Sequence, residues 1–280
     1  MNRIDERFAK VKADGRKALI TFLTVGDPNM EVSEKAIYTM QEEGVDLIEL
    51  GVPFSDPAAD GPVIQRADER ALAQGVDIFK VFELVRKIRN NVELPMVFLL
   101  YYNVMVQYGI EKFFKRCQET GVDGLIIPDL PYEESDEIKE YTEKYGVYQI
   151  SLVSPTSKDR IKNIAKDAKG FLYCISSLGV TGEKSSFVTN FDEFVGTIKK
   201  YTDVPACVGF GVSNGRQVKE LTKYFDGAIV GSAIVKSIAT GESVEERINN
   251  LREKIDKDEK VKLIHTVRGA GYVLKSGEDK

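Results

Sequence analysis

The chain has 280 residues, of which 42% are hydrophobic and 30% charged, and its formal net charge is −5. This composition is typical of a folded globular protein and excludes disorder over most of the chain. The acidic balance gives no footprint for binding nucleic acid or an anionic membrane, so we expect a small-molecule or protein partner.

The first residues predict a short amphipathic helix, because Ile4, Phe8 and Val11 recur at helical spacing before Gly15. Apolar runs rich in β-branched residues follow, and most of them end near Gly, Pro, Asp or Ser. This pattern is typical of parallel strands buried on both faces. The eight runs are ALITFLTV (18–25), DLIEL (46–50), PMVFLLYY (95–102), GVDGLIIP (121–128), VYQISLV (147–153), GFLYCIS (170–176), VPACVGF (204–210) and FDGAIVG (225–231).

Helical stretches alternate with these runs, and several end in Gly, as a C-cap does. The second interval is the longest and predicts two helices, one in residues 62–75 and one in residues 76–90. Eight such repeats favour a closed (β/α)8 TIM barrel with an N-terminal extra helix and an inserted helix after strand 2. With a last helix from Val244 to Lys262, we expect residues 1–263 to form a single domain and residues 264–280 a C-terminal tail.

The side chains available for chemistry are restricted. Cys117, Cys174 and Cys207 are far apart and form no CxxC pair, so we expect buried free thiols in a cytoplasmic protein. No apolar run approaches the ~18 residues of a membrane span, and we expect no membrane association. The single histidine, His265, lies near the C-terminus, which excludes a His triad or a multi-His metal site elsewhere.

The ends of the last two strands predict a phosphate site. In such a barrel the active site lies at the C-terminal ends of the strands, and phosphate commonly binds after strands seven and eight. Here these strands end in Gly209–Phe210–Gly211 and Gly231–Ser232, each before a helix. Glycines at helix N-termini favour an anion cradle, although ordinary turn glycines are the alternative. After strand six, residues 177–187 have the composition of a flap, with Thr181 and Gly182 at its working end.

A carboxylate interrupts the second apolar run. Burying Glu49 is costly unless the acid is paired, neutralised or used. Alternation puts Glu49 on the same strand face as Leu47, and its place near the strand end puts it at the barrel mouth; a buried ion pair is the alternative. Asp60 lies in a loop without a neighbouring cation, and its alternative role is an N-cap before Pro62. Two large aromatic residues, Tyr102 and Tyr173, fall in strands three and six. Such side chains can belong to the barrel core or line the substrate pocket.

Several motifs together indicate a family. IELGVPFSDPAADGPVIQ (48–65) resembles the signature of the tryptophan synthase alpha subunit, and the resemblance covers about residues 1–260 in order. It continues through FLTVGDPN (22–29), LLYYN (99–103), GVDGLIIPDLP (121–131), SPTSKDRI (154–161), YCISSLGVTG (173–182), VGFGVSN (208–214) and GAIVGSAIV (227–235).

The resemblance implies a lyase that cleaves indole-3-glycerol phosphate by retro-aldol chemistry to indole and glyceraldehyde 3-phosphate, without a metal or organic cofactor. Glu49 would carry the proton for indole C3, and Asp60 would accept the ring N–H. The substrate-binding residues implied by motif position are Phe22, Leu100, Tyr102, Tyr173, Thr181 and Phe210, and the phosphate-binding residues are Gly182, Gly211, Gly231 and Ser232.

The resemblance also implies a partner, a beta subunit that carries pyridoxal phosphate, in a cytoplasmic alpha2beta2 heterotetramer of tryptophan biosynthesis. Two features depart from the family pattern: Val104 stands where many members have Pro, and the tail contains HTVRGAGYVLK (265–275). The alternatives are another phosphosugar-binding barrel enzyme, a non-catalytic barrel that activates a beta subunit, and a DNA-associated protein that uses the tail.

Overall fold

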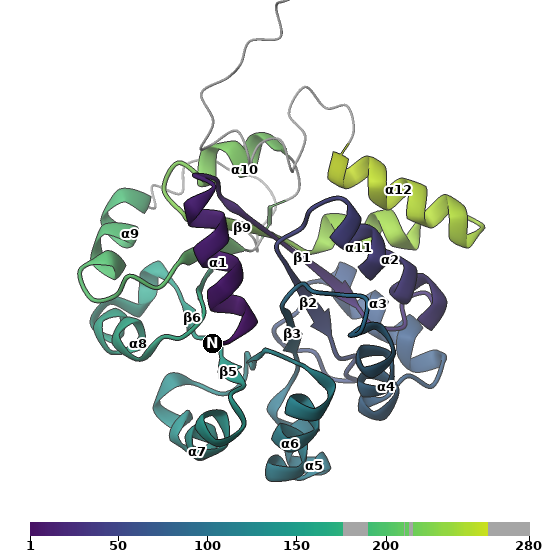
Figure 1. Cartoon of the computed structure of the whole chain (residues 1–280), viewed down its shortest axis with the longest axis horizontal. Helices are drawn as coiled ribbons and strands as arrows, with labels where there is room; N and C mark the ends of the chain where they lie inside the picture. Colours follow the sequence, from purple (N-terminus) through teal and green to yellow (C-terminus); the bar gives the residue numbers. More distant parts are fainter. Residues whose placement is uncertain (176–189, 210, 213–214, 257–280) are drawn as a thin grey trace, which may run out of the picture.

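The computed structural model describes residues 1–175, 190–209, 211–212 and 215–256. Strands and helices alternate along this part of the chain, and the strands form one parallel sheet curled around a common axis with helices outside it (Figure 1). The strands are β1 (Ala18–Thr24), β2 (Leu47–Gly51), β3 (Met96–Leu99), β4 (Gly124–Ile126), β5 (Tyr148–Gln149), β6 (Leu152–Val153), β7 (Leu172–Ile175), β8 (Ala206–Gly209) and β9 (Gly227–Val230).

The helices confirm both predicted additions to the barrel, the N-terminal helix and the second helix between β2 and β3. The first half of the chain contains α1 (Arg3–Ala13), α2 (Met30–Glu42), α3 (Pro62–Ala73), α4 (Ile78–Ile88), α5 (Tyr102–Tyr108) and α6 (Ile110–Thr120). The second half contains η1 (Tyr132–Glu134), α7 (Asp136–Tyr145), η2 (Pro155–Arg160), α8 (Ile161–Asp167), α9 (Phe191–Lys199), α10 (Gly215–Leu221), α11 (Ser232–Ala239) and α12 (Val244–Asp256).

The predicted fifth strand closes the barrel, and it is split in two. The sheet order is β5-β4-β3-β2-β1-β9-β8-β7-β6, so the two sheet edges are consecutive pieces of one run. The Ile150 N–H donates to the Leu125 carbonyl at 2.8 Å, and the Tyr173 N–H donates to the Ser151 carbonyl at 3.0 Å. The run therefore pairs with β4 in its first half and with β7 in its second, which confirms the (β/α)8 barrel and accounts for the ninth strand.

Helix α1 covers the N-terminal end of the barrel (Figure 1). Asn2 caps the helix by accepting the Ile4 N–H, and Ile4, Phe8 and Val11 pack into the cluster of side chains that fills the barrel interior. Ile4 lies close to two glycines: a Cβ at Gly124 would be 3.2 Å from the Ile4 side chain, and a Cβ at Gly170 would be 3.1 Å from it. The chain therefore opens with a helix that closes one end of the barrel and leaves the other end for chemistry.

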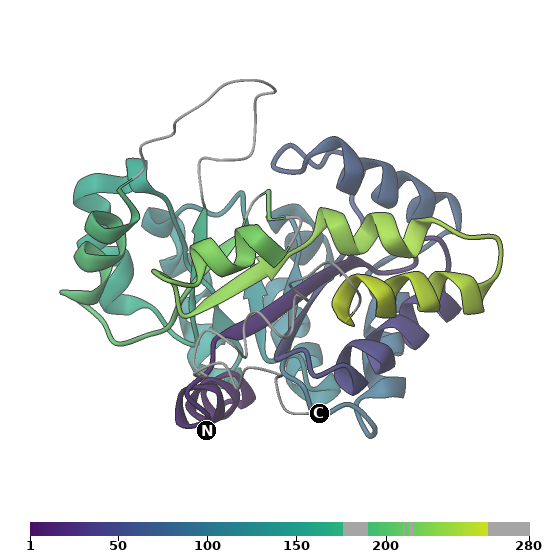
Figure 2. The ribbon, with the colours of Figure 1, turned by 90° about the horizontal axis from the view of Figure 1, so that it is seen from above.

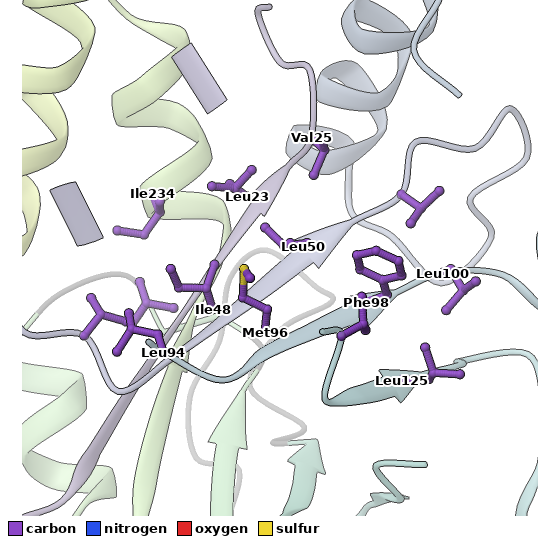
Figure 3. Packing of buried hydrophobic residues seen from close by; sticks show 14 of the residues in the cluster. Leu23, Val25, Ile48, Leu50, Leu94, Met96, Phe98, Leu100, Leu125 and Ile234 are labelled. Carbon is purple, nitrogen blue, oxygen red and sulfur yellow. The ribbon is translucent and has the colours of Figure 1, made fainter. Parts of the chain in front are cut away.

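A second cluster of side chains lies between the strands and the surrounding helices. Figure 3 shows Ile48, Leu50, Phe98 and Leu100 in it, which are side chains of β2, of β3 and of the residue after β3. Figure 2 shows α12 lying beside α11 and α2, against which it packs. Residue-by-residue alternation between the interior cluster and this outer cluster decides which side chains of each strand face the barrel axis.

The third predicted strand is shorter than expected, and the predicted end of the domain is not described. The run 95–102 is a strand only over Met96–Leu99, and Tyr102 begins α5, so the expectation that Tyr102 lies in strand three is wrong. The boundary expected at residue 263 lies outside the described residues, and the division into a domain and a tail stays a prediction. None of the described helices is long and apolar enough to cross a membrane.

Candidate active site

Glu49 is buried at the mouth of the barrel, near the end of β2. Leu47 packs in the interior cluster while Ile48 and Leu50 pack outside, so the alternation predicted for Glu49 is confirmed. The residue is 1% exposed, and its Oε1 atom has no hydrogen-bond partner within the described part of the chain. Burial raises the pKa of Glu49 to about 8. The side chain therefore holds a proton at neutral pH and can release it.

Two aromatic rings lie beside Glu49. Phe22 pairs with Glu49 in the register of β1 and β2, and a Cβ at Gly51 would lie 2.5 Å from the Phe22 ring. On the other side, a Cβ at Gly209 would lie 2.5 Å from the Tyr173 hydroxyl. Burial and then the nearby Glu49 raise the pKa of Tyr173. The two glycines therefore give room for Phe22 and Tyr173 to form walls around the acid.

Asp60 lies in the loop between β2 and α3 and is bound by a tyrosine. The Tyr101 hydroxyl donates to Asp60 Oδ2 at 2.7 Å and accepts the Ala59 N–H at 2.9 Å, while the Tyr101 ring stacks on Phe54. Burial raises the pKa of Asp60, and the Tyr101 hydrogen bond opposes that shift. Gly61, not Asp60, is the N-cap of α3. The Asp60 carboxylate is thus held at the mouth instead of capping the helix.

Two predicted pocket residues, Leu100 and Tyr102, are each wrong by one residue along the chain. Leu100 packs in the outer cluster (Figure 3), and the Tyr102 hydroxyl donates to Glu137 Oε2 at 2.5 Å, away from Asp60. Their neighbours take the expected places: Leu99 packs beside Phe22 and Tyr101 binds Asp60. The alternation that places Glu49 could also have placed Leu99, because Phe98 and Leu100 share the outer face.

Tyr102 has a different function in the structure. Its N–H donates to both carboxylate oxygens of Asp129, at 2.9 and 3.1 Å, which stabilises the start of α5. Burial and the bond to Glu137 raise the pKa of the Tyr102 hydroxyl to about 12. This residue therefore connects α5 to neighbouring elements on the outside of the barrel and does not line the space around Glu49.

The predicted phosphate residues lie at the same end of the barrel, as far as they are described. Gly231 is the N-cap of α11 and Ser232 its first residue, and a Cβ at Gly231 would lie 3.6 Å from Phe22. Gly211 has a φ of 76°, a left-handed conformation that favours glycine. The remaining predicted residues lie outside the described residues: Thr181, Gly182 and Phe210.

One acid at the mouth was missed by the sequence reading. Asp68 of α3 is 4% exposed, and the Thr24 hydroxyl donates to its Oδ1 atom at 3.4 Å. Burial, and then the charge of Asp60, raise the pKa of Asp68 to about 8. The signal was present in the sequence, because Asp68 falls on the apolar face of its helix between Ile64 and Ala71.

Other candidate binding features lie elsewhere. Among the described residues, no group of three or more His, Cys, Asp or Glu is arranged to hold a metal ion. A cavity of about 660 Å³ lies between the elements around α7 and those around α8. Its lining includes Leu152 and Ile175, which border the interior cluster, but neither Glu49 nor Asp60. The two candidate acids therefore lie at the mouth of the barrel and outside this cavity.

Comparison with known proteins gives one family. Residues 8–264 match the family described as "Tryptophan synthase alpha chain". The tryptophan synthase alpha chain of Thermoanaerobacter sp. (strain X514) is 48% identical over 252 residues, which cover 90% of this chain and 96% of that protein. The tryptophan synthase alpha chain of Methanocaldococcus jannaschii is 46% identical over 238 residues, which cover 84% of each.

Solved structures agree with the sequence relatives. Tryptophan synthase subunit alpha from Legionella pneumophila str. Paris has a TM-score of 0.78 at 34% identity and covers 90% of this chain and 98% of its own. A chain of the tryptophan synthase structure from Mycobacterium tuberculosis in space group F222 has a TM-score of 0.83 at 33% identity, covering 97% and 99%. Both the sequence and the overall structure therefore place this chain in the tryptophan synthase alpha chain family.

Proposed function

We propose that the chain catalyses the alpha reaction of tryptophan biosynthesis, the retro-aldol cleavage of indole-3-glycerol phosphate to indole and glyceraldehyde 3-phosphate. The observation that carries the proposal is the pair of carboxyl groups at the mouth. Burial raises the pKa of Glu49 to about 8, whereas Asp60 is half-buried and bound by Tyr101. Two acids in different environments suit two different tasks.

Glu49 acts first as an acid and then as a base. Its carboxyl group delivers a proton to indole C3, which places positive charge on the ring and weakens the bond to the glycerol carbon. The resulting carboxylate takes the proton of the hydroxyl on that carbon. The carbon–carbon bond then breaks, its electron pair returns to the ring to form indole, and the glycerol carbon becomes the aldehyde. Glu49 is protonated again at the end of the cycle.

Asp60 stabilises the charge that develops on the ring. As a carboxylate it accepts the indole N–H, which becomes more acidic when C3 is protonated. Tyr101 holds the carboxylate in place through the 2.7 Å hydrogen bond. Phe22, Leu99 and Tyr173 form the apolar walls in this proposal.

The phosphate group of the substrate binds at the start of α11. Gly231 and Ser232 lie at the N-terminus of this helix, where backbone N–H groups and the helix dipole favour an anion. Gly211 contributes backbone close to the same end of the barrel, and we assign Thr181, Gly182 and Phe210 to the same site by motif position. The phosphate would then anchor the substrate with its indole ring toward Glu49.

The direct test is indole release from indole-3-glycerol phosphate by the full chain, measured with and without a beta subunit. The proposal expects indole and glyceraldehyde 3-phosphate in equal amounts under both conditions. Binding of the substrate without any indole, even with the beta subunit, would contradict it and favour the non-catalytic barrel. Turnover of a different phosphosugar with no reaction of this substrate would favour another phosphosugar enzyme.

We also propose a beta subunit that carries pyridoxal phosphate as the partner, in an alpha2beta2 assembly. Large apolar side chains are exposed on the helices next to the mouth: Phe79 of α4 is 59% and Val106 of α5 is 45% exposed. Val104 donates its N–H to the Tyr101 carbonyl at 3.0 Å, a bond that the family's usual Pro cannot make. Replacing Val106 by Glu should weaken activation by the beta subunit and leave the rate of the isolated chain unchanged. The cytoplasmic location stays a prediction.

A further inference from the structure

Asp68 is a buried acid beside the proposed site that the reaction scheme above does not use. It lies on α3, the helix that follows directly from the loop carrying Asp60, and it faces Thr24 at the end of β1. Two arginines lie near it on the same helix. Arg66 is exposed, and the guanidinium of Arg70 donates to both oxygens of Asp27, at 2.7 and 2.8 Å. Within the described part of the chain no Lys or Arg forms an ion pair with Asp68.

The surroundings of Asp68 are apolar or negatively charged. Its neighbours on the buried face of α3, Ile64 and Ala67, pack in an apolar cluster with Val235 of α11. Two carboxylates act on it from loops, Asp60 before α3 and Asp27 after β1, and both raise its pKa in addition to the effect of burial. From the segment after β3, the Tyr101 hydroxyl is also within its electrostatic reach. A charged Asp68 would thus have no compensating cation and two like charges nearby.

We propose that Asp68 is a positioning residue for the cleavage reaction. By remaining uncharged, Asp68 leaves Asp60 as the charged carboxylate on this side of the mouth. The inference rests on the proposed function. While Asp68 is neutral, Asp60 keeps its bond to Tyr101 and faces the ring nitrogen. When Asp68 ionises, two negative charges repel each other across the start of α3, and Asp60 is displaced from Tyr101.

The consequence is a steeper loss of activity at alkaline pH than Glu49 alone would cause. Glu49 must hold a proton to deliver it to C3, and the pKa of each of the two acids is about 8. In the wild-type chain both lose their protons as the pH rises through this range. The logarithm of kcat/KM should therefore fall by more than one unit per pH unit, approaching about two.

The experiment compares kcat/KM for indole release over about pH 6 to 10 in the wild-type chain and in Asp68→Asn. The amide mimics the neutral acid, so near pH 7 we expect activity within about threefold of wild type, and the alkaline slope should decrease to about one. Glu69→Gln is the matched control: it removes one negative charge from the exposed face of the same helix and should keep the wild-type slope. If the Asp68→Asn variant does not fold, Asp68→Ser takes its place, and the same alkaline slope of about one is expected.

Equal slopes in wild type and in a folded Asp68 variant would overturn the inference. Carboxyl ¹³C NMR titration gives an independent readout: the Asp60 signal of the wild-type chain should show a titration step near pH 8, and this step should be absent in Asp68→Asn. An Asp68 that ionises at the usual acidic pH would also overturn it. A wild-type chain that releases no indole would overturn the proposed function and with it the positioning role, whereas the titration would still report whether the two carboxyl groups are coupled.

Discussion

The two ends of β2 contain buried acids in opposite electrostatic environments. Asp46, directly before the strand, is 1% exposed and accepts hydrogen bonds from Arg16 Nη1 at 2.7 Å and from the Leu19 N–H at 2.9 Å. Glu49, three residues later, is equally buried, and no cation of the described residues pairs with it. Because the burial is the same, the difference between the two acids comes from their partners.

The same contrast recurs on the next strands. Asp123, before β4, binds Arg3 at 2.6 Å, Arg89 at 3.2 Å and the Met96 N–H at 2.9 Å. At the opposite end of the barrel, Asp60 has the Tyr101 hydroxyl as its partner. Asp46 and Asp123 at the N-terminal end therefore connect strands through charge pairs, whereas Glu49 and Asp60 at the C-terminal end form no ion pair with any cation of the described residues. This agrees with the general division of such barrels into a stabilising face and a catalytic face.

The largest effect on activity is expected at Glu49, the buried acid that pairs with no cation of the described residues. Replacing Glu49 by Gln removes the mobile proton and keeps the shape, so indole release should fall about 10³-fold. Binding of a non-cleavable indole alkyl phosphate, measured by calorimetry, should change little, because the walls and the phosphate site are intact. A variant with near-wild-type turnover would remove Glu49 from the mechanism.

At the other end of β2, the corresponding change should affect stability and not turnover. Arg16→Met leaves the Asp46 carboxylate buried without its closest cation, and we expect a loss of about 3 kcal/mol in the free energy of unfolding. Urea denaturation measures this loss, and kcat of the folded variant should stay at the wild-type value. A large drop in kcat without loss of stability would break the division between the two ends.

Ionisation of the buried Glu49 should destabilise the fold, so stability should depend on pH. Its pKa is about 8 in the folded chain against an ordinary value of 4.5, so the folded state binds the proton more tightly than the unfolded state does. The stability from this proton is fully present below pH 4.5 and is lost as the pH rises to about 8. At neutral pH, Glu49→Gln should therefore be more stable than wild type by roughly 3 kcal/mol. Denaturation at acidic pH is the control, since the gain should disappear there.

The smallest effect separates two adjacent tyrosines. Tyr101→Phe removes the bond to Asp60 but keeps the ring stacked on Phe54, so kcat/KM should fall about fivefold, which corresponds to about 1 kcal/mol. Tyr102→Phe is the matched control, because its hydroxyl binds Glu137 outside the barrel. A loss of activity in Tyr102→Phe with none in Tyr101→Phe would restore the pocket expected from the sequence motif.

Much of the site follows from local patterns. Alternation along β2 is sufficient to place Glu49 on the inner face, because the side chains of a strand alternate strictly between its two faces. The same rule does not reach past Leu99, where the strand ends and the chain turns into α5. Beyond that point the direction of a side chain depends on the turn, which is why the sequence assigned to Tyr102 the position that Tyr101 occupies beside Asp60. The split of the fifth strand into β5 and β6 likewise depends on which neighbour each half pairs with.

The sequence by itself determined the eight strand runs, the helix that opens the chain and the family, and it singled out Glu49 and Asp60 as the candidate acids. These features depend on hydrophobic periodicity and on a long contiguous motif, both of which are local. Only the tertiary structure decided that Asp46 is paired and Glu49 is not, that Tyr101 holds Asp60, and that the charge of Asp60 acts on the buried Asp68. Partners and burial arise from elements that are distant in sequence, and a carboxyl group's proton affinity depends on those surroundings.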